Sequence, residues 1–591
     1  MTLWQIAAVS TAVAGLLPAA SLDAAQARAH PTFITDVAPV LDRHCVRCHR
    51  PDGSAPAVSL VSYGAAKLWA ASIKQNVLDR KMPPWPVDPE HSVKLRNDPR
   101  LSQPDIDTLV GWVDAGAVRG EGIDPALPSS NRGWLHPQGI APDAVVALPE
   151  YSLPASGEIP YVVRRVKVQF AEDKWIVAMQ VRPGNEALVH HMGITEIALG
   201  EGLSLEQADA FAALAVQMGM PDGSAATTHP AVTDPSDPDS YDMLGVYTPG
   251  TTFESFRDGG GKLLKAGGNY YLNFNIHYTP IGVAATDRSQ LALWFANKPV
   301  AHQLFRLPAA VETVVVNGRQ LLSDDPGTKA EGTDVPIPPI PRYAENFEVI
   351  GSTAYTQPVT LYQLQPHAHM RGKDFTYSVV FPDGRERTLL TIPQYDFHWQ
   401  LAYELETPLR LPPGSKLIVT AHYDNSTNNP HLRNLGGGDL ARNCGPDKEA
   451  YFRKQNQTWN EMFSPLAQYS LDGSTVGPGS GKHPALSLVE VAGCLAGEPG
   501  AWQLQNAGDP RITQTQSTSA AERDAHRSSL GSRQFDLLGA RIFGPDKLAG
   551  HAVVVKGVLI GSGSSARINL TSLQSVAGTC AAAPRTAQRA P

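Results

Sequence analysis

The sequence lacks a basic cluster, a long membrane-spanning run and a carboxylate-rich metal motif. The formal net charge of -8 is spread along the 591 residues. The sequence therefore indicates no basic surface of the kind that binds nucleic acid. Beyond the first 29 residues no stretch is long and apolar enough to cross a bilayer. The first absence sets aside a nucleic-acid-binding protein, and the lack of carboxylate-rich clusters argues against a site for hard cations.

The composition indicates a globular, turn-rich and mainly β protein. Hydrophobic residues make up 42% and charged residues 18%, with 51 Gly and 49 Pro, a profile unlike that of a disordered chain or a coiled coil. At roughly 150 residues per domain, the length predicts three to four domains.

The first 29 residues resemble a secretory signal peptide. An apolar run, residues 6–20, is too short to span a bilayer and is followed by the A-x-A patterns of residues 25–27 and 27–29. The segment before it, Met1 to Gln5, has no Lys or Arg, which leaves open a wrong start site or a lipid-facing anchor. We expect residues 1–29 to be removed and the protein to be periplasmic or secreted.

Cys45-Val46-Arg47-Cys48-His49 is a C-x-x-C-H motif. In c-type haem attachment two thiols at this spacing form thioethers, and the adjacent imidazole becomes an axial iron ligand. A disulfide or a zinc half-site is the alternative, but no second Cys/His pair lies nearby. The motif therefore predicts covalent haem c on Cys45, Cys48 and His49.

The surrounding residues 30–122 have the pattern of a small all-α cytochrome c domain. Apolar periodicity predicts helices over Phe33 to His44, Tyr63 to Leu78 and Pro104 to Ala115. Between the last two lies Lys81-Met82-Pro83-Pro84-Trp85, where a Pro-restrained Met82 is the candidate sixth iron ligand.

Five further histidines fall in three segments that read as β-strands. They are His190 and His191, His277, and His367 and His369. On a strand, residues two apart share a face, so His367 and His369 can bind one ion. The adjacent pair would need a bulge, a strand end or different ring nitrogens. Taken singly, each group also fits a polar couple on a solvated strand face, whereas together their imidazoles suit copper.

The order of these motifs resembles the ascorbate-dependent type II copper monooxygenases, the family of peptidylglycine α-hydroxylating and dopamine β-monooxygenases. The resemblance covers about residues 151–471 and includes Asn460-Glu461-Met462. It implies two packed antiparallel β-sandwiches, each carrying one copper ion. His190, His191 and His277 match the electron-storing site. His367, His369 and Met462 match the catalytic site that binds oxygen and substrate.

The flanking pattern agrees with that architecture. Alternating apolar and polar residues between Gly and Pro turns predict a first sandwich over 151–305, after a linker over 123–150, and a second over 346–472. The Pro-rich residues 306–345 are expected to form a stiff, extended connector. His422 in the second sandwich is expected to be structural rather than a spare ligand.

Some positions depart from the amidating members of the family. Gln365 stands where the family's peptide-anchoring Arg would lie, and Phe463, Ser464 and Pro465 follow Met462 in place of the expected Asn and Tyr. A C-terminal glycine peptide is therefore not the expected substrate. Bacterial proteins that fuse an "MPPW" cytochrome c to this copper module are more similar.

After a linker over 473–485, residues 486–591 predict a small β-barrel-like domain of unassigned role. Short strands are expected over Ser487 to Cys494, Phe535 to Ala540, His551 to Ile560 and Ile568 to Val576. Cys494 and Cys580 flank this set and are expected to form a disulfide, which leaves Cys444 outside it.

The sequence predicts a haem-linked copper monooxygenase that hydroxylates a C–H bond of a small organic substrate with O₂. A periplasmic electron donor is expected to act through the haem on two copper sites. A copper-binding or electron-transfer protein with a non-catalytic module is the main alternative. A blue-copper or nitrite-reducing enzyme would need a Cys ligand beside His, and Cys444 has no His at that spacing.

Overall fold

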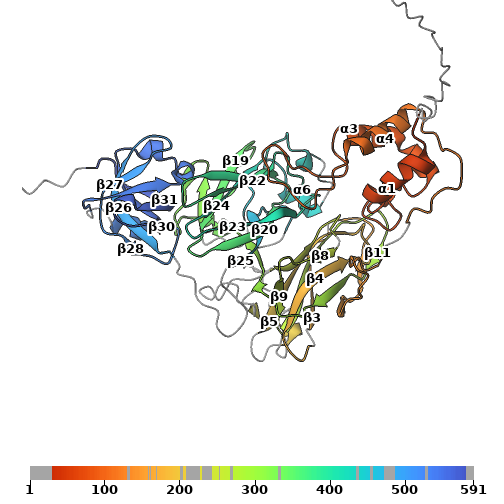
Figure 1. Cartoon of the computed structure of the whole chain (residues 1–591), viewed down its shortest axis with the longest axis horizontal. Helices are drawn as coiled ribbons and strands as arrows, with labels where there is room; N and C mark the ends of the chain where they lie inside the picture. The colour runs from red at the N-terminus through yellow and green to blue at the C-terminus, as the bar shows by residue number, and fades with distance from the viewer. Residues whose placement is uncertain are drawn as a thin grey trace, which may run out of the picture.

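A computed structural model of the chain describes residues 30–580 with gaps at 129–132, 158, 160, 168–169, 200–203, 208–226, 229–242, 252, 266–269, 330–334, 434, 436–437, 453–456, 472–485 and 526–529. The expected signal peptide and the 473–485 linker lie outside these residues. The prediction of a multidomain, mainly β chain is confirmed (Figure 1).

The N-terminal region, residues 30–122, is helical. Its elements are η1 Phe33–Val37, α1 Ala38–His44, η2 Pro56–Val58, α2 Tyr63–Leu68, α3 Ala70–Leu78 and α4 Gln103–Asp114. Ser102 caps α4 by accepting a hydrogen bond from the Asp105 amide at 3.3 Å. Ile106, Leu109 and Trp112 on one face of α4 are buried in the core of this region, as the 3.6-residue period predicts.

The first β region contains two larger sheets around one core and a two-stranded sheet formed by β2 and β11. Its strands are β1 Ala144–Ala147, β2 Tyr151–Leu153, β3 Val162–Lys167, β4 Lys174–Arg182, β5 Val189–Leu199, β6 Thr227–Thr228, β7 Met243–Tyr247, β8 Phe253–Ser255, β9 Gly260–Leu264, β10 Tyr270–Tyr278, β11 Ala285–Asp287, β12 Gln290–Phe295 and β13 His302–Gln303. One sheet has the order β1-β12-β4-β9-β13 with β8 beside β4, and the other β3-β10-β5-β6 with β7 beside β5. Side chains from both sheets form the core, among them Ile176, Leu272 and Phe274.

The second β region is also two-layered. Its elements are β14 Phe305–Pro308, β15 Thr313–Val316, β16 Arg319–Gln320, β17 Thr328–Lys329, β18 Pro336–Ile337, β19 Phe347–Ala354, β20 Val359–His367, β21 Gly372–Val380, β22 Glu386–Ile392, β23 Tyr403–Leu411, β24 Lys416–Tyr423, η4 Pro430–Leu432, α6 Gly438–Asn443 and β25 Ser464–Leu471. The sheet β14-β25-β20-β23 faces the sheet β16-β15-β19-β24-β21-β22 across a shared apolar core.

Two segments expected to be linkers are parts of these sheets. Within 306–345, β14 pairs with β25 and β15 pairs with β19, while Ile340 bridges Ala450. Val314, Val316 and Ile337 of this segment are buried, and apolar side chains of this kind favour burial over an exposed, extended chain. Within 123–150, β1 pairs with β12. The prolines therefore do not separate the two β regions as a stiff connector.

The C-terminal region forms a closed sheet. Its elements are β26 Leu488–Ala496, β27 Gln503–Ala507, β28 Arg511–Ile512, α7 Ala520–Ala525, β29 Arg533–Leu538, η5 Ala540–Phe543, η6 Pro545–Leu548, β30 Ala552–Ile560, η7 Gly563–Ser565 and β31 Arg567–Ala577. The order is β27-β29-β31-β30-β26, and β27 also pairs with β26, which closes the ring. The predicted disulfide joins Cys494 to Cys580, while Cys444 lies buried in the second β region.

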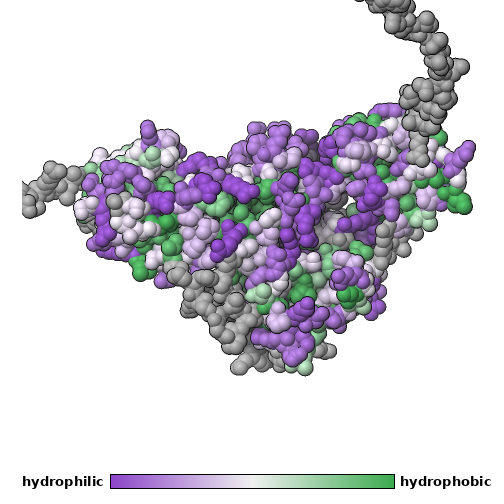
Figure 2. All heavy atoms as spheres, viewed as in Figure 1, coloured by the Kyte–Doolittle hydropathy of each residue, from purple (hydrophilic) through white to green (hydrophobic). Residues whose placement is uncertain are grey.

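In Figure 1 the C-terminal region lies at one end and the helical region at the other, with the second β region between them and the first β region below. On the face shown in Figure 2, hydrophilic side chains predominate and hydrophobic ones form scattered groups. None of the helices in the described part of the chain has the length and apolar character needed to cross a bilayer.

Candidate metal centre

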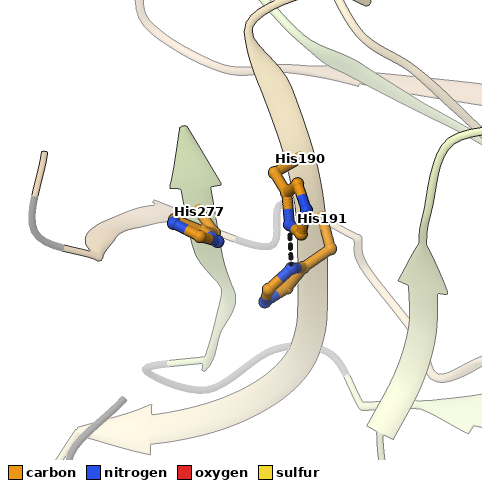
Figure 3. A group of neighbouring side chains, drawn as sticks. All are labelled: His190, His191 and His277. Atoms are coloured by element: carbon orange, nitrogen blue, oxygen red, sulfur yellow. Dashed lines mark hydrogen bonds between the residues drawn. The ribbon is translucent and has the colours of Figure 1, made fainter. Parts of the chain in front are cut away.

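The first histidine cluster comes from two neighbouring strands of the first β region. His190 and His191 stand at the start of β5, and His277 lies near the end of β10. His277 pairs with His191, and Tyr278 pairs with Val189, so His190 is an extra residue in the ladder. This β-bulge is the irregularity that an adjacent histidine pair needs to place both rings on one site. Figure 3 shows the three rings gathered between the two strands.

The ring nitrogens of this cluster converge. His190 Nδ1 and His191 Nδ1 are 2.9 Å apart, and one nitrogen from each of the three rings lies within 4.8 Å of the others. His190 Nε2 and His277 Nδ1 are buried and have no hydrogen-bond partner among the described residues. Burial lowers the pKa of His190 to about 3 and those of His191 and His277 well below the usual value, helped by the neighbouring imidazoles. All three rings are therefore neutral near pH 7, the form that binds metal.

The second cluster lies where β20 ends and β25 begins. His367 is the last residue of β20, His369 follows two residues later, and Met462 precedes β25. The expectation that both histidines lie on one strand is wrong for His369, because the chain turns at Met370 and Arg371 into β21. The ring centroids of His367 and His369 are 5.4 Å apart, and His367 Nε2 lies 3.3 Å from Met462 Sδ. The turn, rather than strand alternation alone, brings these two rings together.

Hydrogen bonds fix the tautomer of both rings. His367 Nδ1–H donates to Gln400 Oε1 at 2.6 Å, and His369 Nδ1–H donates to the Asn460 carbonyl at 3.0 Å. Each hydrogen bond keeps the proton on Nδ1, so Nε2 has a free lone pair and is the atom that can bind a metal. His369 Nε2 is buried and has no hydrogen-bond partner among the residues that the structure describes. Burial lowers the pKa of His367 to about 4 and that of His369 to about 3.

Glu461 and Arg371 hold the backbone of the second cluster. The Glu461 carboxylate accepts hydrogen bonds from the amides of His369 at 2.9 Å, Arg371 at 2.8 Å and Met462 at 3.3 Å. The buried Arg371 guanidinium donates to Asn425 Oδ1 and to two backbone carbonyls. Burial raises the pKa of Glu461 to about 7, although Arg371 and the three amides act in the opposite direction. One carboxylate thus ties the histidine turn to the methionine.

The two clusters face each other across the contact between the β regions. The ring centroids of His191 and His367 are 5.9 Å apart. The Tyr161 ring stacks on His277 at 4.7 Å and lies 6.3 Å from His369, and its hydroxyl is 3.1 Å from His191 Nε2. Phe397 is buried beside both clusters, with ring centroids 4.9 Å from His190 and 6.0 Å from His369. The six candidate ligands therefore form one continuous site.

Polar contacts hold the two β regions in this arrangement. The buried Arg306 on β14 forms an ion pair with Glu254 on β8 and donates to Gln363 on β20 at 2.8 Å. Tyr362 on β20 bonds His302 on β13, with 3.0 Å between Oη and Nε2. Removing one partner of the buried Arg306–Glu254 pair would cost free energy of unfolding. These contacts therefore hold the two β regions, and with them the two clusters, at a fixed separation.

The donor set fits copper. Neutral imidazole and thioether are the ligands that copper prefers, and thioether in particular suits Cu(I). The buried nitrogens without partners, together with the oriented Nδ1–H groups of the second cluster, are what a ligand shell requires before the metal binds.

The geometry of the C-x-x-C-H motif is compatible with the covalent haem that the sequence predicts. The amides of Cys48 and His49 donate to the Cys45 carbonyl at 3.1 and 3.0 Å, so the motif forms a helical turn that carries both thiols and the imidazole. His49 Nδ1–H donates to the Val58 carbonyl at 2.9 Å, which leaves Nε2 for an axial bond. Burial lowers the pKa of His49. Met82 follows α3, and its role as sixth ligand stays a prediction.

The C-x-x-C-H motif is packed against the first β region. Arg50 Nη2 donates to Glu186 Oε1 at 2.7 Å, and Arg47 donates to the Gly250 carbonyl. The side chains of Arg50 and Glu186 are 7% and 18% exposed, so this ion pair is largely removed from water. A cavity between the two regions is lined by Cys48, Arg50, Glu186 and Tyr247. Because Glu186 lies four residues before His190, the motif contacts the loop that leads into the first cluster.

The chain after Met82 contacts the second β region. Trp85 packs on Tyr403 with ring centroids 4.9 Å apart, and the Asp88 and Val93 amides donate to the carbonyls of Thr391 and Leu389. The helical region therefore touches both β regions.

His422 has a structural environment. Its Nδ1 lies 2.6 Å from Asp374 Oδ1 on the neighbouring strand, and this hydrogen bond raises its pKa. Sequence reasoning missed Gln400, Tyr161 and the structural role of Glu461. Only Glu461 carried a signal, its place directly before Met462.

Comparisons with known proteins assign the chain to no family. No family model matches, and no curated protein matches. Among solved structures, the chain is similar to PNGF-II at 8% identity and a TM-score of 0.24, over 57% of this chain and 66% of that one. It is similar to allantoicase at 10% identity and a TM-score of 0.14, over 46% of this chain and 79% of that one. The chain spans slightly less than two thirds of PNGF-II, and scores this low carry no argument about function.

Proposed function

We propose that the protein is a haem-linked, copper-dependent monooxygenase of a bacterial periplasm or of the secreted fraction, which hydroxylates a C–H bond of a small organic substrate with O₂. One observation carries the proposal: six neutral ligand side chains from two β regions meet in one buried site, with His191 and His367 only 5.9 Å apart. In this proposal the helical region is a cytochrome c domain and the two β regions are the paired sandwiches of the copper family.

Each cluster has a distinct role in the proposal. His190, His191 and His277 would hold an electron-storing copper, and His367, His369 and Met462 the copper that meets oxygen and substrate. Bound copper would supply one-electron redox chemistry and oxygen activation. The chain's own groups orient the ligands: Gln400 and Asn460 hold the His367 and His369 rings through Nδ1.

The haem motif supports an electron supply from outside the copper site. A hydroxylation with O₂ takes two electrons beyond those of the substrate, and covalent haem is a one-electron carrier. The Arg50–Glu186 pair anchors the C-x-x-C-H turn on the loop that precedes His190. We therefore assign this contact as the entry point for electrons from a periplasmic donor.

The test combines metal analysis with oxygen consumption. Under reducing conditions, the haem-loaded protein should bind about two Cu(I) ions with imidazole and thioether ligation. After reduction of the haem, it should couple oxygen uptake to a hydroxylated product for at least one member of a panel of C–H substrates. Copper binding without coupled product for any substrate would support the alternative, an electron-transfer protein, and would overturn the monooxygenase.

A narrower test uses Met462→Ile, which keeps the volume of the side chain but removes the thioether. Loss of oxygen activation with retention of the first copper is expected. Full activity in this variant would remove Met462 from the site.

A further inference from the structure

A third group of metal-binding side chains lies at the edge of the histidine site. Asp396 and His398 come from the loop between β22 and β23, and His431 comes from the short helix η4. One donor atom from each lies within 4.8 Å of the other two. Sequence reasoning singled out none of these residues, because the third ligand is distant in the chain from the Asp-x-His pair.

The spacing of these atoms suits a small divalent ion. His398 Nδ1 is 2.9 Å and His431 Nε2 is 3.8 Å from Asp396 Oδ1, and the two rings are 5.3 Å apart. Metal–ligand bonds of 2.0–2.1 Å at tetrahedral angles place neighbouring donor atoms about 3.3 Å apart. The two nitrogen–oxygen distances, 2.9 and 3.8 Å, lie on either side of that value. Small movements of the side chains would therefore bring the three donor atoms to the spacing that a bound metal requires.

The three side chains differ in how firmly they are held. His431 is 16% exposed, and its amide donates to Asn429 Oδ1 at 2.9 Å, which caps η4. The Asn429 side chain in turn donates to the carbonyls of Met370 and Asp424. Asp396 and His398 are 42% and 60% exposed. One largely buried ligand on a capped helix and two exposed ligands on a loop leave an open side where water can complete the coordination.

The loop also reaches the copper site. Phe397, between the two outer ligands, is buried against His190, and the ring centroids of His190 and His398 are 5.7 Å apart. Gln400, three residues after Phe397, orients His367. An ion bound by Asp396, His398 and His431 would therefore tie this loop to η4 and restrict the positions of Phe397 and Gln400.

We propose that Asp396, His398 and His431 form a third metal site for a divalent first-row transition ion. Two imidazoles and one carboxylate are a donor set for zinc, copper(II), nickel or iron(II) and lack the thioether that marks the second cluster. This site does not depend on the proposed monooxygenase activity, since it needs none of the six other ligands.

The experiment counts ions in the haem-loaded, metal-stripped protein, with Zn²⁺ and Co²⁺ as probes. Elemental analysis after equilibrium dialysis against Zn²⁺ should find one ion fewer per chain in the double variant His398→Gln/His431→Gln than in the wild type. When the protein is titrated with Co²⁺, the visible absorption of the bound ion should contain one component fewer in this double variant than in the wild type. Affinity at this site should fall more than about 100-fold, because losing only an outer hydrogen-bond partner of a metal ligand costs about 10–100-fold.

His91→Gln is the matched control. His91 Nδ1 lies 2.7 Å from Asp88 Oδ2 in an exposed Asp–His pair that has no third ligand in the described groups, so this change should leave the ion count unaltered. Asp396→Asn, which preserves shape, serves if the double variant fails to fold. Equal ion counts in the wild type and in the variant that folds, whether the double variant or Asp396→Asn, would overturn the proposal.

Discussion

At the scale of single residues, Gln400 decides which nitrogen of His367 carries the proton and which is free to bind a metal. Its Oε1 atom accepts the Nδ1–H of His367 at 2.6 Å, and its Nε2–H donates to the Phe397 carbonyl at 3.0 Å. A neutral imidazole has two tautomers, so the partner of one nitrogen sets the role of the other. Replacing this partner tests the second cluster without removing a ligand.

Gln400→Leu should weaken copper binding at the second cluster by about 10–100-fold, the usual effect of losing an outer partner. Gln400→Glu keeps an acceptor at the same place and should retain most of the affinity. Competition with a Cu(I) chelator measures both. Equal affinity in Gln400→Leu and the wild type would show that the tautomer is set by something else.

The buried histidines should make the metal-free protein acid-sensitive. The pKa of His367 is lowered to about 4 and that of His369 to about 3, whereas in the unfolded chain both are about 6.5. The unfolded state binds more protons between these values, so stability is complete above pH 6.5 and is lost as the pH falls toward 4. Each ring contributes up to about 1.4 kcal/mol per pH unit.

Glu461 acts in the opposite direction, because its pKa is raised to about 7. The contribution of Glu461 to the stability of the folded protein is fully present below the pKa that this carboxyl has in the unfolded chain. It is lost as the pH rises through 7. The five cluster histidines, together with His49 and His431, have lowered pKa values and outweigh the raised pKa values of Glu461, Glu186 and Glu404. The melting temperature of the metal-free protein should therefore fall between pH 6.5 and 4.5. The double variant His367→Gln/His369→Gln should show a shallower slope. A melting temperature that is constant or rises over this range contradicts the prediction.

At the scale of elements, the turn between β20 and β21 depends on Glu461. Three amides donate to this buried carboxylate, and each buried donor left without a partner costs about 1–3 kcal/mol. Glu461→Ala should therefore lower the free energy of unfolding by about 3 kcal/mol or more and abolish copper binding at the second cluster.

Glu461→Gln keeps one acceptor oxygen and should lose less stability. Glu348→Gln on β19, a partly exposed neighbour of His422, is the control and should change little. Thermal unfolding and copper stoichiometry measure all three variants. Unchanged copper binding in Glu461→Ala would separate this carboxylate from the site.

Element patterns explain which parts of the site could be predicted. The alternation of apolar residues located the strands, and an adjacent pair of histidines required an irregularity, which the bulge at His190 supplies. His369 lies beyond the end of β20, because the point where a strand turns depends on the Arg371 and Glu461 network rather than on local pattern. Gln400 and Tyr161 reach the site from distant loops, and nothing near them in the sequence indicates a metal.

At the scale of the whole molecule, the regions are less independent than the sequence suggested. Val315, Ile350, Val380 and Ile418 of the second β region share one core with the C-terminal region. The buried Lys416 donates across this contact to the carbonyls of Gly539 and Leu570, and burial lowers its pKa to about 7. Period-two alternation shows that a strand has an apolar face but not which sheet will cover it, so this joint core could not be predicted.

The contact between the haem motif and the first β region gives the last prediction. Arg50→Gln removes the guanidinium that donates to the largely buried Glu186, and removing one partner of a buried pair costs about 3–5 kcal/mol. A loss of only 1.4 kcal/mol reduces the docked population relative to the undocked one by about 10-fold. In copper-loaded protein, the rate at which reduced haem is reoxidised follows the docked fraction and should fall in Arg50→Gln, by about 10-fold for each 1.4 kcal/mol lost once the undocked form predominates, with Arg50→Lys between the two. Arg100→Gln, whose partner Asp98 lies within the helical region, should leave this rate unchanged. Stopped-flow absorbance measures the rate, and equal rates in Arg50→Gln and the wild type would show that electrons do not enter through this contact.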